Sequence, residues 1–453
     1  MSRQDVSNPV GEPSTIAAIA TASGPGGVGI VRISGPHAVP ILARVLRRSE
    51  GEFIDRHLIH GWAWDILSEE KVDEVLAVAM RRPRSYTGED VGEIHGHGGL
   101  MNMARLLRLV FDAGARAAEP GEFTRRAFQN GRLDLTRAEA VADVIGAASE
   151  RALRVAQAQL QGRLGEVVER LHSRVVGLLA EVEAAIDFPS EDLDFVPLAE
   201  VAAQAASIST ELQKLAGTYV TGRALREGVQ IALVGAPNVG KSSLLNAFVG
   251  QERAIVTPEP GTTRDYVEAR VVWEGVPVLL IDTAGERDAL GEAERRGVEL
   301  GRARARHADV IVRVEDATVT CGSKSGLHKS VGEGEVRIWN KIDLTPGPQG
   351  ELGVSAVTGD GLNELRRMIL NRVLGSSSEG DEAEIVTSER HRQLLDEAAG
   401  SVGRAALIAK EARPHELVAV DLREAANRLS AIMGVDSGEA VLEQIFSRFC
   451  IGK

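Results

Sequence analysis

One stretch decides the fold of the central part of this chain: Val229-Gln230-Ile231-Ala232-Leu233-Val234-Gly235-Ala236-Pro237-Asn238-Val239-Gly240-Lys241-Ser242. Its apolar start, 229–234, is typical of a buried strand, and the rest matches the phosphate-binding loop that joins a strand to a helix. Glycines in such a loop let backbone N–H groups surround phosphates, and the helix N-terminus adds a favourable dipole. Lys241 can reach the β- and γ-phosphates, and the Ser242 hydroxyl can ligate Mg²⁺. We therefore predict a nucleotide-binding α/β domain.

Four shorter motifs follow in the order that a GTP-binding domain requires. In the first, Thr263 offers a second hydroxyl to Mg²⁺. In the second, Asp282 can hold the metal through water, and the amide of Gly285 can meet the γ-phosphate. In the third, the Asp343 carboxylate can accept from N1–H and the exocyclic amine of guanine, which adenine cannot supply. The fourth offers a backbone contact to the base. The motifs are Gly261-Thr262-Thr263-Arg264-Asp265, Asp282-Thr283-Ala284-Gly285, Asn340-Lys341-Ile342-Asp343 and Ser355-Ala356-Val357.

The glutamine that orients water in Ras-like enzymes is missing. Glu286 follows the second motif in its place, so another group must position the nucleophile. Carboxylates stand nearby in Glu292-Ala293-Glu294-Arg295-Arg296-Gly297, where a loop could bring one of them to the site. The same charges would suit the solvated start of a helix, and the chemistry of the residues alone does not decide between these two interpretations.

Regions of different composition and hydrophobic periodicity flank the nucleotide motifs. Residues 15–132 mix short apolar runs with glycine turns, which predicts an α+β domain. Helical blocks with apolar residues at a spacing of three and four lie on both sides of the α/β region, which extends to Leu374. We therefore predict one helical domain made from both blocks, with the α/β domain inserted between its helices. The helical stretches are 135–188, 198–215, 387–409 and 417–433, and a linker occupies 375–382.

Composition bounds the class of protein. The 453 residues are 43% apolar, which suffices for several cores. The net charge of −13 excludes a generally basic nucleic-acid coat. Two cysteines, Cys321 and Cys450, cannot form a disulfide framework, and no apolar run reaches the length of a membrane span. We expect a cytoplasmic protein with about three domains.

The chain resembles one family over essentially its whole length, the MnmE (TrmE) family of tRNA modification GTPases. The resemblance implies an α+β multidomain fold: a tetrahydrofolate-binding-like N-terminal α/β domain (1–133), an all-α helical domain in two parts (134–226 and 376–453), and an inserted Ras-like G domain, a P-loop NTPase (227–375). Besides the nucleotide motifs, it rests on Gly26–Gly35 (GGVGIVRISG), Tyr86–Asp90 (YTGED), Pro120–Thr124 (PGEFT), Asn130–Leu135 (NGRLDL) and Phe449–Lys453 (FCIGK).

The resemblance also implies an activity. The family hydrolyses GTP with K⁺ and Mg²⁺ and works with the flavoprotein MnmG (GidA) in a heterotetramer or a larger complex. Together they add an aminomethyl-type group, such as carboxymethylaminomethyl, to C5 of the wobble uridine of certain tRNAs. A tetrahydrofolate derivative, 5-formyl- or methylene-tetrahydrofolate, supplies the one-carbon unit, and the N-terminal domain makes the chain a homodimer. Pro25 and Glu286 depart from the family's usual residues.

Individual residues take roles from the same resemblance. Glu294 falls on the family's water-activating carboxylate and is preferred to Glu286 and Glu292. An arginine can pair with the glutamyl carboxylate of a folate, and a buried glutamate can hold the donor edge of its pterin. The folate ligands would be Arg32, Glu93, Arg132 and Lys453; the potassium ligands Asn238, Thr257, Glu259 and Thr262; and the magnesium ligands Ser242 and Thr263. The GTP-binding residues would be Asn238, Val239, Gly240, Lys241, Ser242, Ser243, Thr257, Pro258, Glu259, Pro260, Gly261, Thr262, Thr263, Asp282, Thr283, Ala284, Gly285, Asn340, Lys341, Asp343, Ser355, Ala356 and Val357.

Several residues outside the nucleotide motifs have plainer interpretations. Apart from the family, Arg32 would be an edge-strand residue that faces water. We read Cys450 as a buried small residue because nothing beside it would lower its pKa. His95 and His97 are read as parts of a shaped glycine turn, since a metal site needs more ligands than this pair. The polar segment 318–334 is expected to be a loop.

Two other functions compete with the tRNA modification that the resemblance implies. A ribosome-assembly GTPase of the Era or Der type would be an RNA-binding module. Era-like proteins carry a basic KH domain with a GxxG loop after the G domain, whereas this chain opens acidic after Gly375; Der-like proteins carry two G domains, whereas this chain has one phosphate loop. A structural switch without catalysis on RNA would leave the folate motifs unexplained.

Overall fold

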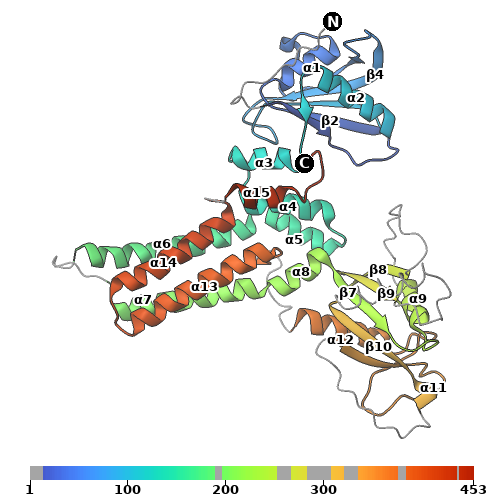
Figure 1. The fold of residues 1–453 in the computed structure, drawn as a ribbon, viewed down its shortest axis with the longest axis vertical. Coiled ribbons are helices and arrows are strands. Elements are labelled where there is room, and N and C mark those ends of the chain that lie inside the picture. Colours follow the sequence, from blue (N-terminus) through green and yellow to red (C-terminus); the bar gives the residue numbers. More distant parts are fainter. Residues whose placement is uncertain are drawn as a thin grey trace. The chain divides into compact units, whose positions relative to one another are not determined.

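The computed structural model of the chain describes residues 14–188, 196–251, 267–282, 308–320, 335–375, 384–435 and 438–453. The chain divides into two compact units, drawn in Figure 1. The first unit contains 1–142 and 430–453, and the second contains 143–429. Helices α4 (Leu135–Gly146) and α14 (His415–Met433) each cross this division in the sequence. Among the described residues, none of the helices combines the length and the apolar composition of a membrane span.

The first unit is built on a mixed sheet whose strands lie in the order β3-β4-β5-β2-β1-β6. Helices α1 (Ala38–Leu46) and α2 (Leu100–Asp112) cover one face, where a core of fully buried residues such as Val31, Ile94 and Leu106 forms. The strands are β1 (Ile16–Ile19), β2 (Val28–Ser34), β3 (Ile59–Trp64), β4 (Lys71–Met80), β5 (Val91–His97) and β6 (Arg116–Ala117); a short 3₁₀ turn, η1, spans Glu50–Glu52.

The opposite face of this sheet is covered at its β1 end. Phe123, in α3 (Glu122–Gln129), packs with Ile16 and Ala18 of β1 in a small separate core. The C-terminal segment reaches the same place through α15 (Glu439–Phe446). Gly452 has a φ of +100°, and a Cβ there would lie 2.3 Å from the carbonyl oxygen of Ile19. Only glycine allows the tail to lie this close to β1.

Helices from both sides of the nucleotide motifs pack together in the second unit. In α6 (Arg163–Asp187), the buried residues Leu164, Val167, Val168, Leu171, Val175, Leu178 and Val182 follow the helical spacing of three and four. Helices α7 (Leu198–Gly217) and α13 (Glu389–Lys410) pack along each other, and the Ser209 hydroxyl donates to the Ala399 carbonyl at 2.9 Å. The helical block that follows the α/β region thus joins the block that precedes it.

The α/β part of the second unit has a six-stranded sheet in the order β12-β11-β10-β7-β9-β8. All neighbours are parallel except β8 and β9, which form a hairpin. The strands are β7 (Val229–Val234), β8 (Val267–Trp273), β9 (Val276–Asp282), β10 (Val310–Asp316), β11 (Glu335–Asn340) and β12 (Gly353–Val354). The remaining helices are α5 (Glu150–Leu160), α8 (Tyr219–Glu227), α9 (Lys241–Gln251), α11 (Ala317–Thr320) and α12 (Leu362–Leu374).

These elements confirm the predicted fold class: a mixed N-terminal α/β domain, a discontinuous helical domain and an inserted P-loop domain. One local prediction is wrong. The segment 318–334 was expected to be a loop, but its first residues, 318–320, belong to α11. Asp316 explains the helix start, because its Oδ1 accepts from the backbone and the hydroxyl of Thr318 at 2.9 and 2.7 Å. Residues 321–334 lie outside the described part of the chain.

Candidate functional site

The phosphate-binding loop has the backbone that its sequence predicts. It leaves β7 at Gly235 and enters α9 at Lys241, with Asn238 and Gly240 in left-handed conformations at φ +64° and +96°. A Cβ on Gly240 would lie 2.2 Å from the side-chain nitrogen of Asn340, so only glycine fits there. The Lys241 ammonium is buried under the loop and donates to the carbonyls of Gly235 and Ala236 at 2.9 and 3.0 Å.

Ser242 and Asp282 meet at the carboxyl end of the sheet, as the magnesium prediction requires. The Ser242 hydroxyl, at the start of α9, donates to Asp282 Oδ2 at 2.6 Å. Asp282 ends β9, which lies beside β7. Its other oxygen, Oδ1, is buried and has no hydrogen-bond partner among the described residues. A buried carboxylate oxygen without a donor fits a cation or its bound water, so these residues are suited to Mg²⁺.

Asn340 connects the base-recognition motif to the phosphate loop. This residue is buried at the end of β11, and its side-chain amide donates to the Val239 carbonyl at 2.8 Å. Its Oδ1 accepts from the backbone N–H of Ala356 at 3.2 Å. The Ser355 hydroxyl, also buried, donates to Asp343 Oδ1 at 2.6 Å and so orients the carboxylate that would meet guanine. Three segments of the sequence are thereby fixed around one location.

Lys341 keeps this end of the sheet in register with the neighbouring strand. It has a φ of +70°, and its ammonium lies 2.6 Å from Asp316 Oδ2 at the end of β10. Burial raises the pKa of Asp316, but hydrogen bonds from Lys341 and Thr318 outweigh burial, so that the pKa falls below its usual value. Ser243 and Val357 are exposed at the edge of the site.

Other predicted nucleotide and catalytic residues lie outside the described residues. They are the potassium and magnesium ligands Thr257, Glu259, Thr262 and Thr263, the GTP contacts Pro258, Pro260, Gly261, Thr283, Ala284 and Gly285, and the carboxylates Glu286, Glu292 and Glu294.

A second polar site lies on the first unit, where Arg32 and Glu93 face each other across β2 and β5. Arg32 Nε donates to Glu93 Oε1 at 2.8 Å, and His95 Nε2 lies 3.0 Å from Glu93 Oε2. The guanidinium of Arg32 also lies over the rings of Tyr86 and Phe123, at 5.3 and 6.0 Å from their centroids. The interpretation of Arg32 as an edge residue in water is wrong, because β2 has a neighbour on each side and the arginine side chain is only 17% exposed.

The C-terminal Lys453 belongs to the same site. Burial lowers the pKa of its ammonium, the positive charge of Arg32 lowers it further, and Glu93 opposes both. Gly452 lies against the Ile19 carbonyl of β1, and β1 pairs with β2, so the tail brings Lys453 close to Arg32 and Glu93. Arg132 is exposed just after α3, and the described contacts include no hydrogen bond or ion pair between its side chain and Arg32 or Glu93.

Sequence reasoning missed His95, Tyr86 and Phe123 as members of this site. The glycine-turn interpretation of His95 and His97 is wrong, because both lie within β5; Gly96 is required there since a Cβ would lie 2.5 Å from Leu106. The signal that could have found His95 is its spacing of two residues from Glu93, which puts both on one face of a strand. Cys450 is exposed and not buried as expected; its neighbour Phe449 occupies the buried position.

The parallel sheet, the phosphate loop and the contacts around Asn340 define a P-loop protein of the guanine-nucleotide-binding class. The sequence family described as MnmE helical domain matches residues 135–450, and the one described as GTP-binding protein TrmE N-terminus matches 15–132. The chain is 43% identical to proteins called tRNA modification GTPase MnmE from Synechococcus sp. (strain JA-2-3B'a(2-13)) and Symbiobacterium thermophilum. Each match covers 97% of this chain, and 98% and 99% of the relatives.

This chain belongs to the MnmE family of tRNA modification GTPases. The resemblance stated from the sequence motifs is thereby confirmed, and the predicted enzyme class, a GTPase, agrees with it. Among solved structures, the Era protein of Aquifex aeolicus is 27% identical over 40% of this chain and 67% of its own, with a TM-score of 0.25. The G domain of the FeoB iron transporter of T. maritima is 24% identical over 32% of this chain and 98% of its own, with a TM-score of 0.22.

Proposed function

We propose that this chain hydrolyses GTP and, with the MnmG (GidA) flavoprotein, adds a carboxymethylaminomethyl-type group to C5 of the wobble uridine of certain tRNAs. The one-carbon unit comes from a tetrahydrofolate derivative. Family membership over the whole chain supports the activity. The observation that carries the GTP part is the buried Asn340, which ties the phosphate loop to the segment that holds Asp343 and Ser355.

At the nucleotide site, each described residue has one task. Lys241 lies under the loop, where its ammonium can turn to the β- and γ-phosphates. Ser242 would hold Mg²⁺ through its hydroxyl and Asp282 through a water molecule, and the metal would neutralise charge that develops on the phosphates. Asp343 accepts from the N1–H and the amine of guanine, because Ser355 fixes its carboxylate.

The potassium part of the proposal rests on the family pattern. Asn238 would supply the side-chain oxygen, and the family pattern assigns the other ligands to the backbone carbonyls of Thr257, Glu259 and Thr262. A monovalent cation there would take the place of the arginine that other GTPases bring to the phosphates. Glu294 orients the attacking water, since Glu286 occupies the position of the usual glutamine.

The folate part concerns the Arg32 site. A folate has a flat pterin with N–H donors and a glutamyl tail with carboxylates. Glu93 has acceptor capacity left on both oxygens after its bonds to Arg32 and His95, so it can receive a pterin amine. The cations of Arg32 and Lys453 suit the tail, and Tyr86 and Phe123 offer aromatic surface. The residues present therefore fit a reduced pterin.

The proposed assembly is a homodimer through the N-terminal domain, bound to MnmG in the cytoplasm, with tRNA as substrate. A net charge of −13 does not favour RNA on electrostatic grounds. We infer that MnmG supplies much of the basic surface that holds the tRNA.

Hydrolysis in two salts tests the GTP part of the proposal together with its potassium part. The purified chain should turn over GTP many-fold faster in KCl than in NaCl at equal ionic strength. Asn238→Gly removes the ligand but keeps a residue that tolerates the φ of +64°, so it should abolish the stimulation without destroying the loop. Equal turnover of the native chain in both salts would refute the potassium assignment.

A further inference from the structure

Helix α3 forms one wall of the Arg32 site. Its first turn presents Phe123 to the Arg32 guanidinium, and Thr124 Oγ1 lies 2.8 Å from the Tyr86 hydroxyl. Tyr86 comes from a different segment, the loop 85–90 between β4 and β5. The aromatic surface beside Arg32 therefore depends on how α3 and this loop are held against each other.

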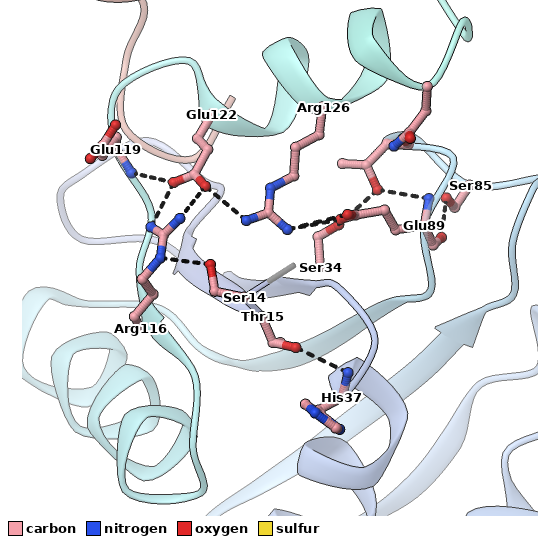
Figure 2. A network of polar contacts seen from close by, with 12 residues as sticks. Ser14, Thr15, Ser34, His37, Ser85, Glu89, Arg116, Glu119, Glu122 and Arg126 are labelled. Carbon is pink, nitrogen blue, oxygen red and sulfur yellow. Dashed lines mark hydrogen bonds and ion pairs between the residues drawn. The ribbon is translucent and has the colours of Figure 1, made fainter. Parts of the chain in front are cut away.

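A buried set of charges joins α3 to the loop (Figure 2). Arg126 donates from Nη1 to both oxygens of Glu89, at 3.0 and 3.3 Å, and from Nη2 to Glu122 Oε1 at 2.8 Å. The three side chains are 11%, 20% and 10% exposed, so the ion pairs are largely removed from water. Glu89 also accepts from the Ser34 hydroxyl at 2.7 Å, and Ser34 lies two residues beyond Arg32 on β2.

The other members of the set fix Glu122. Arg116, at β6, donates to its two oxygens at 2.5 and 2.8 Å, and the backbone N–H of Glu119 donates to it at 3.0 Å. Burial raises the pKa of Glu122, but the hydrogen bonds from Arg116, Glu119 and Arg126 outweigh burial, so that the pKa lies below its usual value. Glu122 is therefore a fixed acceptor at the start of α3. Because Arg126 bonds both Glu122 and Glu89, it fixes the distance between α3 and the loop.

The start of α3 also holds the C-terminal segment. Gly121 has a φ of +69°, and a Cβ there would lie 2.6 Å from the carbonyl oxygen of Phe446. Arg125 forms an ion pair with Glu439 of α15. The segment continues to Lys453 beside Arg32 and Glu93. One short helix thus determines the place of both the loop that carries Tyr86 and the tail that carries Lys453.

We propose that Arg126 is a positioning residue of the Arg32 site: it bridges Glu89 and Glu122, and so fixes Tyr86 beside Arg32 for a reduced pterin ligand. This inference rests on the folate binding proposed above. Buried ion pairs seldom add net stability over apolar packing, so stability alone does not explain them. The planar guanidinium of an arginine donates in fixed directions to two carboxylates at once, whereas the ammonium of a lysine has no such fixed geometry.

Two measurements on the full-length chain test the proposal: calorimetric titration with 5-formyltetrahydrofolate, and hydrogen exchange of residues 85–90. We expect Arg126→Met to weaken binding by on the order of tenfold or more and to speed exchange of the loop, with GTP turnover unchanged. Arg126→Lys keeps the positive charge but loses the planar guanidinium, so its affinity for 5-formyltetrahydrofolate should lie between those of the native chain and Arg126→Met. This variant replaces Arg126→Met if the methionine variant does not fold. Arg81→Met is the matched control, because Arg81 pairs with Asp90 of the same loop but not with α3.

The outcomes separate the two claims. Failure of the native chain to bind 5-formyltetrahydrofolate would refute the folate function, and exchange of 85–90 would still decide the positioning. If residues 85–90 exchange hydrogen at the native rate in folded Arg126→Met, the role of Arg126 is overturned, whatever the affinity for 5-formyltetrahydrofolate. Arg126→Lys takes its place in this comparison if the methionine variant is unfolded. Equal weakening by Arg81→Met and Arg126→Met would also overturn it, because general loosening of the loop would then explain both.

Discussion

In the proposed function, Asp343 gives the nucleotide site its specificity for guanine. Its carboxylate is oriented by the buried hydroxyl of Ser355, which leaves the second oxygen for guanine. Asp343→Asn replaces an acceptor with a donor, so guanine N–H groups lose their partner, whereas the C2 carbonyl of xanthine gains one. We expect GTP affinity to fall by roughly 100-fold or more and xanthosine triphosphate to compete better than GTP.

Displacement of a fluorescent guanine nucleotide measures this change. Asp360→Asn is the control, because Asp360 is an exposed aspartate nearby whose carboxylate accepts from Thr358. Unchanged GTP affinity in Asp343→Asn would place the base elsewhere.

We expect Glu93 to make the stability of the first unit sensitive to acid. Burial raises its pKa, but His95 and Arg32 outweigh burial and bring the pKa below its ordinary value of 4.5. The ionised form is therefore favoured by folding. Its contribution to stability is complete above pH 4.5 and is lost as the pH falls through the folded-state pKa.

We expect Glu93→Gln to cost about 1–3 kcal/mol at pH 7, since Arg32 loses its partner, and to flatten the decline of the unfolding midpoint below pH 4.5. Thermal scans at several pH values, with the exposed Glu50→Gln as control, measure this. An acid decline as steep as that of the native chain would rule out this contribution of Glu93.

The sequence predicts the geometry of a site best where its residues are close together in the chain. The loop from Gly235 to Ser242 is a local motif whose backbone follows from its own glycines. Arg32, Glu93 and Lys453 were assigned only through the family, because cross-strand pairing and the return of the tail bring them together from distant positions. Tyr86 and Phe123 belong to quoted family motifs, but their position beside Arg32 was missed for the same reason.

At the scale of elements, α8 is held by the segment that returns from the α/β region. Gln159 of α5 donates to the Ile385 carbonyl at 2.7 Å, and the Val386 N–H donates to the Thr218 hydroxyl at 3.0 Å. A Cβ on Gly222 of α8 would lie 2.0 Å from the Val386 carbonyl oxygen. The glycine therefore permits backbone contact between α8 and this segment.

Gly222→Ala should destabilise the second unit by roughly 1–3 kcal/mol or more, because backbone and not a flexible side chain must shift. Gly177→Ala, in the middle of α6 with nothing within 4 Å of its new Cβ, is the matched control and should be neutral or stabilising by up to about 1 kcal/mol. Thermal unfolding of both variants decides; equal midpoints would show that α8 and the segment separate easily.

Helical periodicity predicted where helices form but not how they pair. The contact between α7 and α13 depends on small residues such as Ala399 and Gly403 opposite Ser209, which no local pattern marks as partners. The break between α5 and α6 at 161–162 was also unpredicted, because a glycine inside a helical pattern can either continue or end a helix.

The net charge of the whole chain bears on the proposed partnership with MnmG, because it predicts which of the two proteins binds the tRNA. A chain with a net charge of −13 repels the tRNA backbone overall. Filter binding should therefore show weak tRNA binding by this chain alone and tight binding by MnmG or by the complex, in each case weakened by salt. Tight binding by this chain alone would contradict the division.

In the proposed function, GTP hydrolysis by this chain drives modification of the wobble uridine. The decisive measurement is mass analysis of tRNA nucleosides from cells that lack the chain, with the native chain, Glu294→Ala or Glu292→Ala supplied in return. We predict that the C5 substituent is absent without the chain, restored by the native chain and by Glu292→Ala, and not restored by Glu294→Ala at equal protein level. Unchanged wobble nucleosides in the cells without the chain would contradict the account.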